Sequence, residues 1–138
     1  MNFEKLKIEV NILAEPSKVW DYYTNPKHIV NWNFADPSWH CPKAENDMVT
    51  GGKYVARMEA KDGSFGFDFE AIYTEVIIGK SFSYQLSDGR NIDVWFDASD
   101  NLSTIHVEFD AENENSLELQ KNGWQAILNN FKNYVELN

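Results

Sequence analysis

The chain opens with a strand pattern, because apolar and polar side chains alternate over residues 5–12. A helical pattern follows from Pro16, which suits a first helical turn because its missing N–H would have no partner there. Asn25 ends this helix, since a residue that precedes a proline avoids the helical region. A second short helix is expected from Pro26 to Trp32. The pattern therefore predicts one strand followed by two short helices.

Residues 33–52 show neither a helical nor a strand period, and they contain two prolines and a glycine pair. This stretch is expected to be an irregular loop of about 20 residues, a length that is unusual in a compact domain and is often functional. Its aromatic and reactive side chains are Phe34, Trp39, His40 and Cys41. Together with Trp32, these residues are candidates for a lid over one end of the fold.

Five further strand patterns fill the middle of the chain, and turn sequences separate them. An Asp-Gly pair at 62–63 predicts a two-residue hairpin turn, because both residue types tolerate positive φ. This turn sets Met58 opposite Phe67, so that apolar side chains meet. Arg57 then faces Asp68 across the strands, so the turn and the charge pattern agree on one register.

The next hairpin is expected to carry a bulged three-residue loop that ends at Gly89 in the left-handed conformation. This loop sets Tyr84 opposite Ile92, whereas a two-residue turn would bring apolar side chains against polar ones. A later turn brings Trp95 opposite His106 on the outer face of the sheet. An exposed tryptophan there would indicate a dimer or partner surface, and a single aromatic ring packed beside the histidine is the alternative.

A long C-terminal helix is predicted to begin with a capping box, in which Asn115 is the N-cap and Glu118 closes the box. The helix runs to about Leu137, and its apolar stripe comprises Leu117, Trp124, Ile127, Leu128, Phe131 and Val135. Gln120 lies inside that stripe, so its amide needs a partner from the protein, water or a ligand. Gly123 is unfavourable inside a helix, and the close approach of a loop or ligand would explain it.

Six strands with apolar inner faces need a cover, and only the terminal helix is long enough to supply it. The sequence therefore predicts an α+β helix-grip fold, in which a six-stranded curved antiparallel sheet wraps on a long C-terminal helix. The two short helices are expected between the first and second strands. No linker, repeat or low-complexity segment divides the chain, so residues 1–138 are expected to form a single domain.

The net charge is −10, from 12 Lys and Arg against 22 Asp and Glu. Such a charge repels phosphate backbones and anionic lipid headgroups, so no nucleic-acid partner is expected. Cys41 is the single cysteine, so neither an internal disulfide nor a zinc site built from cysteines alone can form. The chain shows no signal-peptide pattern and no run of about 18 apolar residues. A cytoplasmic protein in a reducing environment is expected, without membrane insertion.

The motifs Trp-Asn-Phe-Ala at 32–35 and Trp-His-Cys-Pro at 39–42 accompany a segment at 51–69 that begins with paired glycines, and a Gly-Trp segment at 123–135. Together they resemble the SRPBCC superfamily of START-like lipid carriers, birch-pollen-allergen-like proteins and aromatase/cyclases. Within it the chain resembles the bacterial branch named after the C-terminal domain of the heat-shock protein 90 ATPase activator. That name describes a shared domain, so a co-chaperone role is not carried over. The superfamily implies a cavity between sheet and long helix that holds an apolar ligand.

Aromatic side chains dominate the inner faces of the predicted elements. The candidate ligand-binding residues are Trp32, Phe34, Trp39, His40, Tyr54, Met58, Phe67, Phe69, Tyr73, Phe82, Tyr84, Phe96, Gln120, Trp124 and Leu128. One interpretation is a cavity for a planar or acyl ligand whose polar end meets tyrosine hydroxyls, and the other is a filled aromatic core. No catalytic residue, metal site or cofactor is assigned, because no placed carboxylate orients His40 and no regular metal-ligand spacing occurs.

Three functions remain open at this point. The first is the binding of a small hydrophobic or aromatic molecule without chemistry. The second is a cyclase, aromatase or hydrolase activity, for which His40 or Tyr84 should point into the cavity. The third is a protein-interaction module of the co-chaperone kind, for which Trp95 should lie in an exposed apolar patch. The expected partner is a small apolar or aromatic molecule, with a homodimer as an open alternative.

Overall fold

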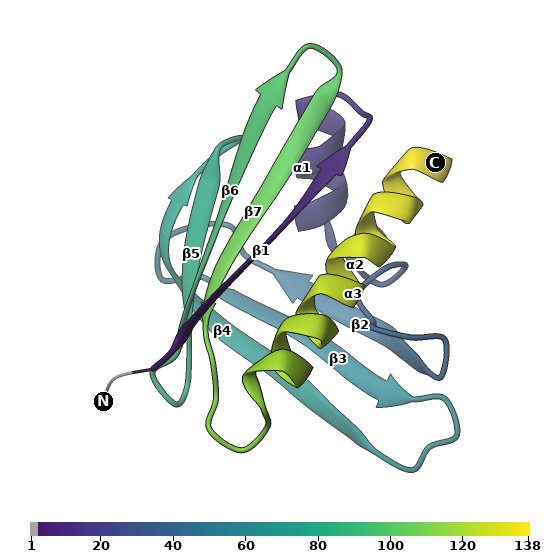
Figure 1. The fold of residues 1–138 in the computed structure, drawn as a ribbon, viewed down its shortest axis with the longest axis vertical. Helices are drawn as coiled ribbons and strands as arrows, with labels where there is room; N and C mark the ends of the chain where they lie inside the picture. The colour runs from purple at the N-terminus through teal and green to yellow at the C-terminus, as the bar shows by residue number, and fades with distance from the viewer. Residues whose placement is uncertain (1–2) are drawn as a thin grey trace.

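The computed structural model describes residues 3–138, which form a seven-stranded antiparallel sheet and three helices (Figure 1). The elements are β1 (Lys5–Ile12), α1 (Pro16–Thr24), α2 (Pro26–Ile29), β2 (Trp39–Asn46), β3 (Lys53–Ala60), β4 (Gly66–Ile77), β5 (Ser81–Leu86), β6 (Asn91–Ser99), β7 (Leu102–Asp110) and α3 (Leu117–Leu137). The strand order across the sheet is β1-β7-β6-β5-β4-β3-β2. The α+β class and the long terminal helix are therefore as predicted.

The long helix covers only part of the sheet. α3 runs diagonally across one face, and β2, β3 and β4 turn away from the direction of β1 and β7 (Figure 1). Its nearest strand is β1, and α1 lies on the same face, in contact with α3, β6 and β7. Leu128, Phe131 and Val135 are the buried residues of α3. The space between α3 and the β3–β5 half of the sheet is therefore left for side chains to fill.

The predicted strand registers are correct. Met58 pairs with Phe67 and Arg57 with Asp68 in the β3–β4 ladder. The turn of that hairpin is nevertheless longer than the expected two residues. Ala60 N–H donates to the Phe65 carbonyl at 2.9 Å, so the four residues 61–64 lie inside the last hydrogen-bonded pair. A three-residue loop joins β5 to β6, with Gly89 at φ +94°, as the bulged hairpin requires.

The predicted six strands were one too few, because β2 lies inside the stretch expected to be an irregular loop. β2 is an edge strand whose register shifts between His40 and Lys43. Pro42 falls inside that bulge, one of the few places where a strand tolerates proline. The shift breaks the alternation of apolar and polar side chains, so the strand leaves no period in the sequence.

Two helix boundaries also differ from the prediction. α2 ends at Ile29 and not at Trp32, because the chain closes in tight turns there, with Trp32 N–H donating to the Ile29 carbonyl at 3.2 Å. The N-cap of α3 is Ser116, whose hydroxyl accepts from Leu119 N–H at 3.1 Å. Asn115 therefore lies one residue before the cap. Within residues 3–138, no helix has both the length and the apolar content that a membrane span requires.

An ion pair between the exposed Lys5 and the buried Asp110 fastens the start of β1 to the rest of the sheet. Asp110 is 4% exposed, and its two carboxylate oxygens accept from Lys5 Nζ and from Asn91 N–H, each at 2.8 Å. Burial opposes ionisation of this carboxyl, but the hydrogen bonds from Lys5 and Asn91 outweigh it and lower the pKa of Asp110. The ionised form of Asp110 therefore stabilises the fold.

We expect Asp110→Asn to lower the free energy of unfolding by about 1–2 kcal/mol at neutral pH, since it removes charge-assisted hydrogen bonds. Because the folded-state pKa of Asp110 is lowered, this stabilisation is present above the ordinary carboxyl pKa of about 4 and is lost as the pH falls through the folded-state value. Urea unfolding at several pH values should show the deficit shrinking towards acid. A deficit that does not depend on pH would contradict this, and Glu114→Gln, which removes an exposed carboxyl, is the control.

Gly123 is not packed closely by a loop, contrary to one of the expectations above. A methyl group placed there would meet no atom within 4 Å. We therefore expect Gly123→Ala to stabilise the protein by about 1 kcal/mol, the difference in helix propensity between the two residues. Chemical denaturation measures this directly, and a loss of stability would show that the position needs glycine for a reason that the packing does not reveal.

Candidate functional site

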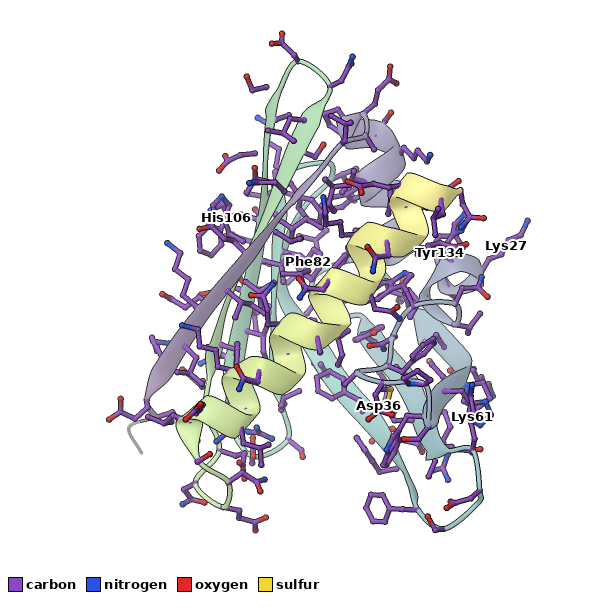
Figure 2. All side chains as sticks on the ribbon, turned by 45° about the vertical axis from the view of Figure 1, so that its right-hand side comes forward. Lys27, Asp36, Lys61, Phe82, His106 and Tyr134 are labelled. Carbon is purple, nitrogen blue, oxygen red and sulfur yellow. The ribbon has the colours of Figure 1, made fainter. Side chains whose placement is uncertain are left out.

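A cavity of about 200 Å³ lies between α3 and the concave face of the sheet. Its walls are mainly aromatic, and it is partly open to solvent. Ten of the residues singled out from the sequence line it: Trp32, Tyr54, Met58, Phe67, Phe69, Tyr73, Phe82, Tyr84, Trp124 and Leu128. Figure 2 shows Phe82 between the sheet and α3, with His106 on the opposite side of the sheet. The inner faces of β3, β4 and β5 thus meet α3 across a space that side chains do not fill.

Phe96 and Gln120 face the interior but do not line this cavity. Phe96 is covered by α1, where its ring centroid lies 5.1 Å from that of Trp20 and 5.7 Å from that of Tyr23. Gln120 braces the connection between β7 and α3, because its Oε1 accepts from Glu112 N–H at 2.8 Å. Its Nε2 donates to backbone carbonyls of the same connection. The amide therefore has protein partners, one of the outcomes left open by the sequence.

Four residues of the expected lid also lie outside the cavity lining: Phe34, Trp39, His40 and Cys41. Phe34 borders a separate shallow groove beside α3. The side chain of His40 is 41% exposed, with its Nε2 3.6 Å from a carboxylate oxygen of Glu59. Trp39 packs edge-on against Phe67 on the β3–β4 hairpin, with ring centroids 6.3 Å apart. Strand β2 holds Trp39 and His40 at the sheet edge, which explains why they do not close over the cavity.

The cavity is also lined by seven residues that the sequence analysis did not single out: Ile8, Tyr23, Thr24, Asn33, Asn46, Val107 and Ile127. Ile8, Val107 and Ile127 occupy inward positions of periodic elements, and Tyr23 belongs to the apolar edge of the first helix, so their patterns could have indicated them. Asn33 and Asn46 lie in or next to irregular chain, and no sequence signal marks them.

Polar contacts set the orientation of two of the tyrosines. The hydroxyl of Tyr73 donates to Asn46 Oδ1 at 2.6 Å, and Asn46 Nδ2 donates to the Thr24 carbonyl at 2.7 Å. Asn33 Nδ2 donates to the hydroxyl of Tyr54 at 3.2 Å. Asn46, the last residue of β2, thus links β4 to the end of α1, and Asn33 in the loop before β2 contacts β3. These contacts fix two of the tyrosines that line the cavity.

The glycine pair at 51–52 holds this arrangement in place. Gly51 N–H donates to the Tyr73 carbonyl at 2.8 Å, and Tyr73 N–H donates to the Gly52 carbonyl at 2.9 Å. Gly51 has φ +87°, and a side chain at Gly52 would come within 2.1 Å of the Asp47 carbonyl oxygen. Both glycines are therefore required for the turn that docks on β4.

Burial governs the ionisation of the tyrosines at the cavity. It is the main cause that raises the pKa of Tyr23, Tyr54, Tyr73 and Tyr84, and the proximity of Tyr23 adds to the effect at the other three. The phenols therefore remain protonated at neutral pH and act as hydrogen-bond donors. In the part of the chain that the structure describes, no group of three or more His, Cys, Asp or Glu is placed to hold a metal ion.

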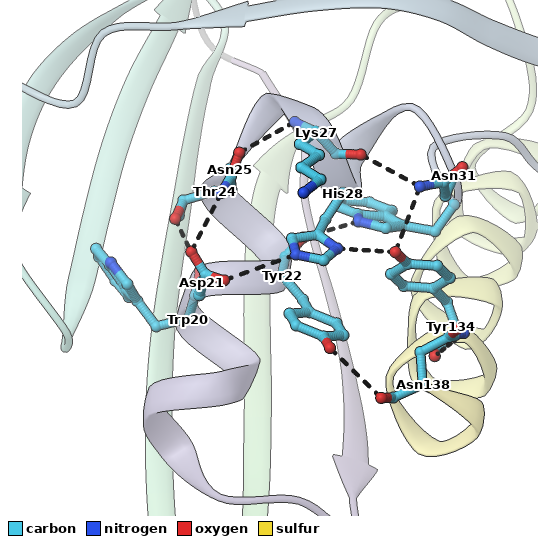
Figure 3. A network of polar contacts seen from close by, with 11 residues as sticks. Trp20, Asp21, Tyr22, Thr24, Asn25, Lys27, His28, Asn31, Tyr134 and Asn138 are labelled. Atoms are coloured by element: carbon cyan, nitrogen blue, oxygen red, sulfur yellow. Dashed lines mark hydrogen bonds and ion pairs between the residues drawn. The ribbon is translucent and has the colours of Figure 1, made fainter.

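A second polar cluster joins the short helices to the C-terminal half of α3 (Figure 3). His28 Nδ1 lies 2.8 Å from the hydroxyl of Tyr134, and its Nε2 lies 3.7 Å from Asp21. Tyr22 stacks on the imidazole with a centroid separation of 3.9 Å, and Asn31 Nδ2 donates to the Tyr134 hydroxyl at 3.3 Å. This cluster fastens α1 and α2 to α3 and contributes no side chain to the cavity lining.

On the outer face of the sheet, the neighbours of Trp95 that the structure describes include a histidine and a lysine. The side chain of Trp95 is half-buried and stacks on His106 with centroids 5.1 Å apart, while Lys7 lies over its ring at 5.4 Å. His106 in turn approaches the carboxylates of Asp97 and Glu9 at 2.8 and 3.5 Å. Of the two alternatives considered for Trp95, an exposed tryptophan and an aromatic ring packed beside the histidine, the structure shows the second.

We expect Tyr73→Phe to lower the free energy of unfolding by about 1–3 kcal/mol, because it leaves the Asn46 amide oxygen without its donor. Tyr84→Phe should change that free energy by less than about 0.5 kcal/mol, since its hydroxyl makes no hydrogen bond with residues 3–138. Thermal or urea denaturation of both variants tests the difference. Equal losses in the two would contradict this description of the polar contacts.

Comparison with known proteins places this fold in a family. Residues 13–136 match the family described as Activator of Hsp90 ATPase homolog 1-like protein. The solution structure of the AHSA1-like protein from Aeromonas hydrophila is 40% identical, covers 97% of this chain and 93% of its own, and superposes with a TM-score of 0.91. A solution structure from Cytophaga hutchinsonii is 43% identical over 96% of this chain and 92% of its own, with a TM-score of 0.84.

More distant structures share the fold alone. A crystal structure from Chromobacterium violaceum is 18% identical, covers 96% of this chain and 98% of its own, and has a TM-score of 0.84. No functionally curated protein matches the chain. The family match spans most of the sequence, and its solved relatives are similar over nearly their whole length. The chain therefore belongs to the family of Activator of Hsp90 ATPase homolog 1-like proteins.

Proposed function

We propose that the protein is a binding module that encloses one small, planar, apolar molecule between α3 and the sheet. The cavity of about 200 Å³, with its mainly aromatic walls, is the observation that carries this proposal. An apolar cavity of about 150 Å³ is large enough to hold benzene in a protein interior. The space in this chain therefore suits a molecule of one or two fused rings.

The position of the cavity mouth supports exchange of such a ligand with solvent. Phe67 on β4 is 42% exposed, and Ile127 on α3 is half-buried, yet both line the cavity. Trp124 beside them is held by stacking on Phe109, with centroids 4.1 Å apart. Phe67 has more freedom, since its aromatic neighbours are Trp39, at the start of the edge strand β2, and the exposed Phe65.

Binding is favoured over catalysis by the chemistry of the lining. His40 lies outside the cavity lining, so the acid–base role considered for it has no geometric support. Tyr84 does line the cavity, but burial raises its pKa and opposes formation of the phenolate. The cavity walls, as the structure describes them over residues 3–138, contain no Asp, Glu, His, Lys or Arg with which a tyrosine could form an acid–base pair.

The family description supplies no further function for this chain. It names an activator of the Hsp90 ATPase, which is a statement about the protein that gave the family its name. The outer face around Trp95 offers polar and charged neighbours in place of an apolar docking patch. We therefore propose ligand binding alone.

Titration with naphthalene, followed by protein NMR, tests the proposal. We expect saturable chemical-shift changes centred on cavity residues. Ile127→Trp should fill the mouth and weaken binding about ten-fold or more, because overpacking a cavity wall costs about 1–3 kcal/mol. Leu119→Trp makes the same kind of change on an exposed position of α3 outside the lining and should bind as the wild type does.

The absence of saturable binding to the wild-type protein would refute the proposal. Equal affinities of the wild type and a correctly folded Ile127→Trp variant would also refute it, since the ligand would then occupy another site.

A further inference from the structure

Two of the tyrosines at the cavity have hydroxyl groups without a partner. Tyr23 and Tyr84 line the cavity, and neither hydroxyl makes a hydrogen bond with any group in residues 3–138. Among the described side chains, the only fully enclosed polar atom without a hydrogen-bond partner is His106 Nδ1, on the other face of the sheet. The two hydroxyls are therefore not sealed in the packing and border the open space.

Aromatic side chains of the core surround the ring of Tyr23. Its ring lies 5.0 Å from Trp32, 5.0 Å from Phe131, 5.7 Å from Phe96 and 6.0 Å from Phe82, centroid to centroid. These four rings surround it on the interior side of α1. The ring is thus packed among aromatic rings of the core, and the same side chain lines the cavity.

Both hydroxyls are donors that need an acceptor. Burial raises the pKa of each phenol, so each keeps its proton at neutral pH. Tyr54 adds a third donor, since its oxygen accepts from Asn33 while its own proton has no acceptor within the described residues. An unpaired donor in apolar surroundings is unfavourable, and a bound molecule that accepts from it would remove that penalty.

The lining also selects against charge. It contains no cationic side chain for a carboxylate and no carboxylate for an ammonium, as far as residues 3–138 are concerned. Burying an unpaired charge is far less favourable than burying a neutral acceptor. The net charge of −10 repels anions further, and an ammonium would present donors to phenol groups that are already donors.

The shape of one wall favours a flat molecule. Tyr54 and Tyr84 are nearly parallel, at 24° and 5.8 Å between centroids, and Phe82 continues the series at 29° and 6.0 Å from Tyr84. Aromatic rings in this arrangement present a surface against which another ring can stack. The wall lies beside the donors, because Tyr84 belongs to both.

We propose that the cavity selects neutral, planar molecules that carry a hydrogen-bond acceptor, such as an aromatic ketone, and that the hydroxyls of Tyr23 and Tyr84 bind this acceptor. The inference rests on the proposed function and adds the chemical class of the ligand. It also assigns the two residues that recognise the polar end.

Four naphthalene derivatives of similar size test the inference by calorimetry: methyl naphthyl ketone, ethylnaphthalene, naphthoate and naphthylmethylammonium. We expect the ketone to bind about ten-fold more tightly than ethylnaphthalene, since hydrogen bonds of ordinary strength distinguish the two. The two charged compounds should bind more weakly than ethylnaphthalene.

Single variants locate the donors. Tyr23→Phe and Tyr84→Phe should each lower the affinity for the ketone about three- to ten-fold, and neither should lower the affinity for ethylnaphthalene, which has no acceptor for the hydroxyl. Tyr134→Phe removes a hydroxyl from the His28 cluster, outside the cavity lining, and should leave both affinities unchanged. NMR spectra of the ligand-free variants establish that each is folded before it is compared.

The outcomes separate this inference from the proposed function. If ethylnaphthalene binds in the cavity as tightly as the ketone, or if naphthoate binds most tightly, the inference fails while the binding function stands. Ketone affinity that is unchanged in both folded cavity variants would also overturn it. If none of the four compounds binds, the proposed function fails and the inference with it.

Discussion

The packing of α3 against one side of a strongly curved sheet is the constraint on which the rest of the structure depends. Its 21 residues span about 31 Å, enough to cross the sheet, but the helix lies nearest β1. Phe131 and Val135 of this helix are fully buried, and Phe131 packs against Tyr23 of α1 and against Trp32. The strands at the other end curve away, so only long side chains can bridge the remaining space. An incompletely filled interior follows from this geometry.

Aromatic rings bridge that space without closing it. Trp124 reaches from α3 to Phe69 on β4 in an edge-to-face contact, with centroids 6.3 Å apart, and it is also stacked on Phe109. Rings are rigid, so they leave voids that flexible side chains would fill. The ion pair of Lys5 with Asp110 and the polar cluster around His28 keep the sheet edge and α3 in place. The cavity is thus maintained by contacts outside it.

Periodic segments of the sequence predicted their elements and, through the turn residues, their registers, as with Gly89 and the pair Tyr84–Ile92. The bulged edge strand at Trp39–Asn46 could not be predicted, because its register shift removes the alternation on which such a prediction depends. Inward-facing aromatic residues were identified, but alternation gives only the face of a residue. It cannot show that α1 covers Phe96 while leaving Tyr84 at an open space, since that depends on how separate elements pack.

Diffraction from crystals under xenon pressure tests the central claim, the unfilled space between α3 and the sheet, most directly. Xenon enters dry apolar cavities of this size without needing hydrogen bonds. The account predicts an ordered xenon atom among the lining side chains, between Tyr84 and Trp124. A structure in which α3 closes on β4 and β5 and leaves no room for xenon there would contradict it.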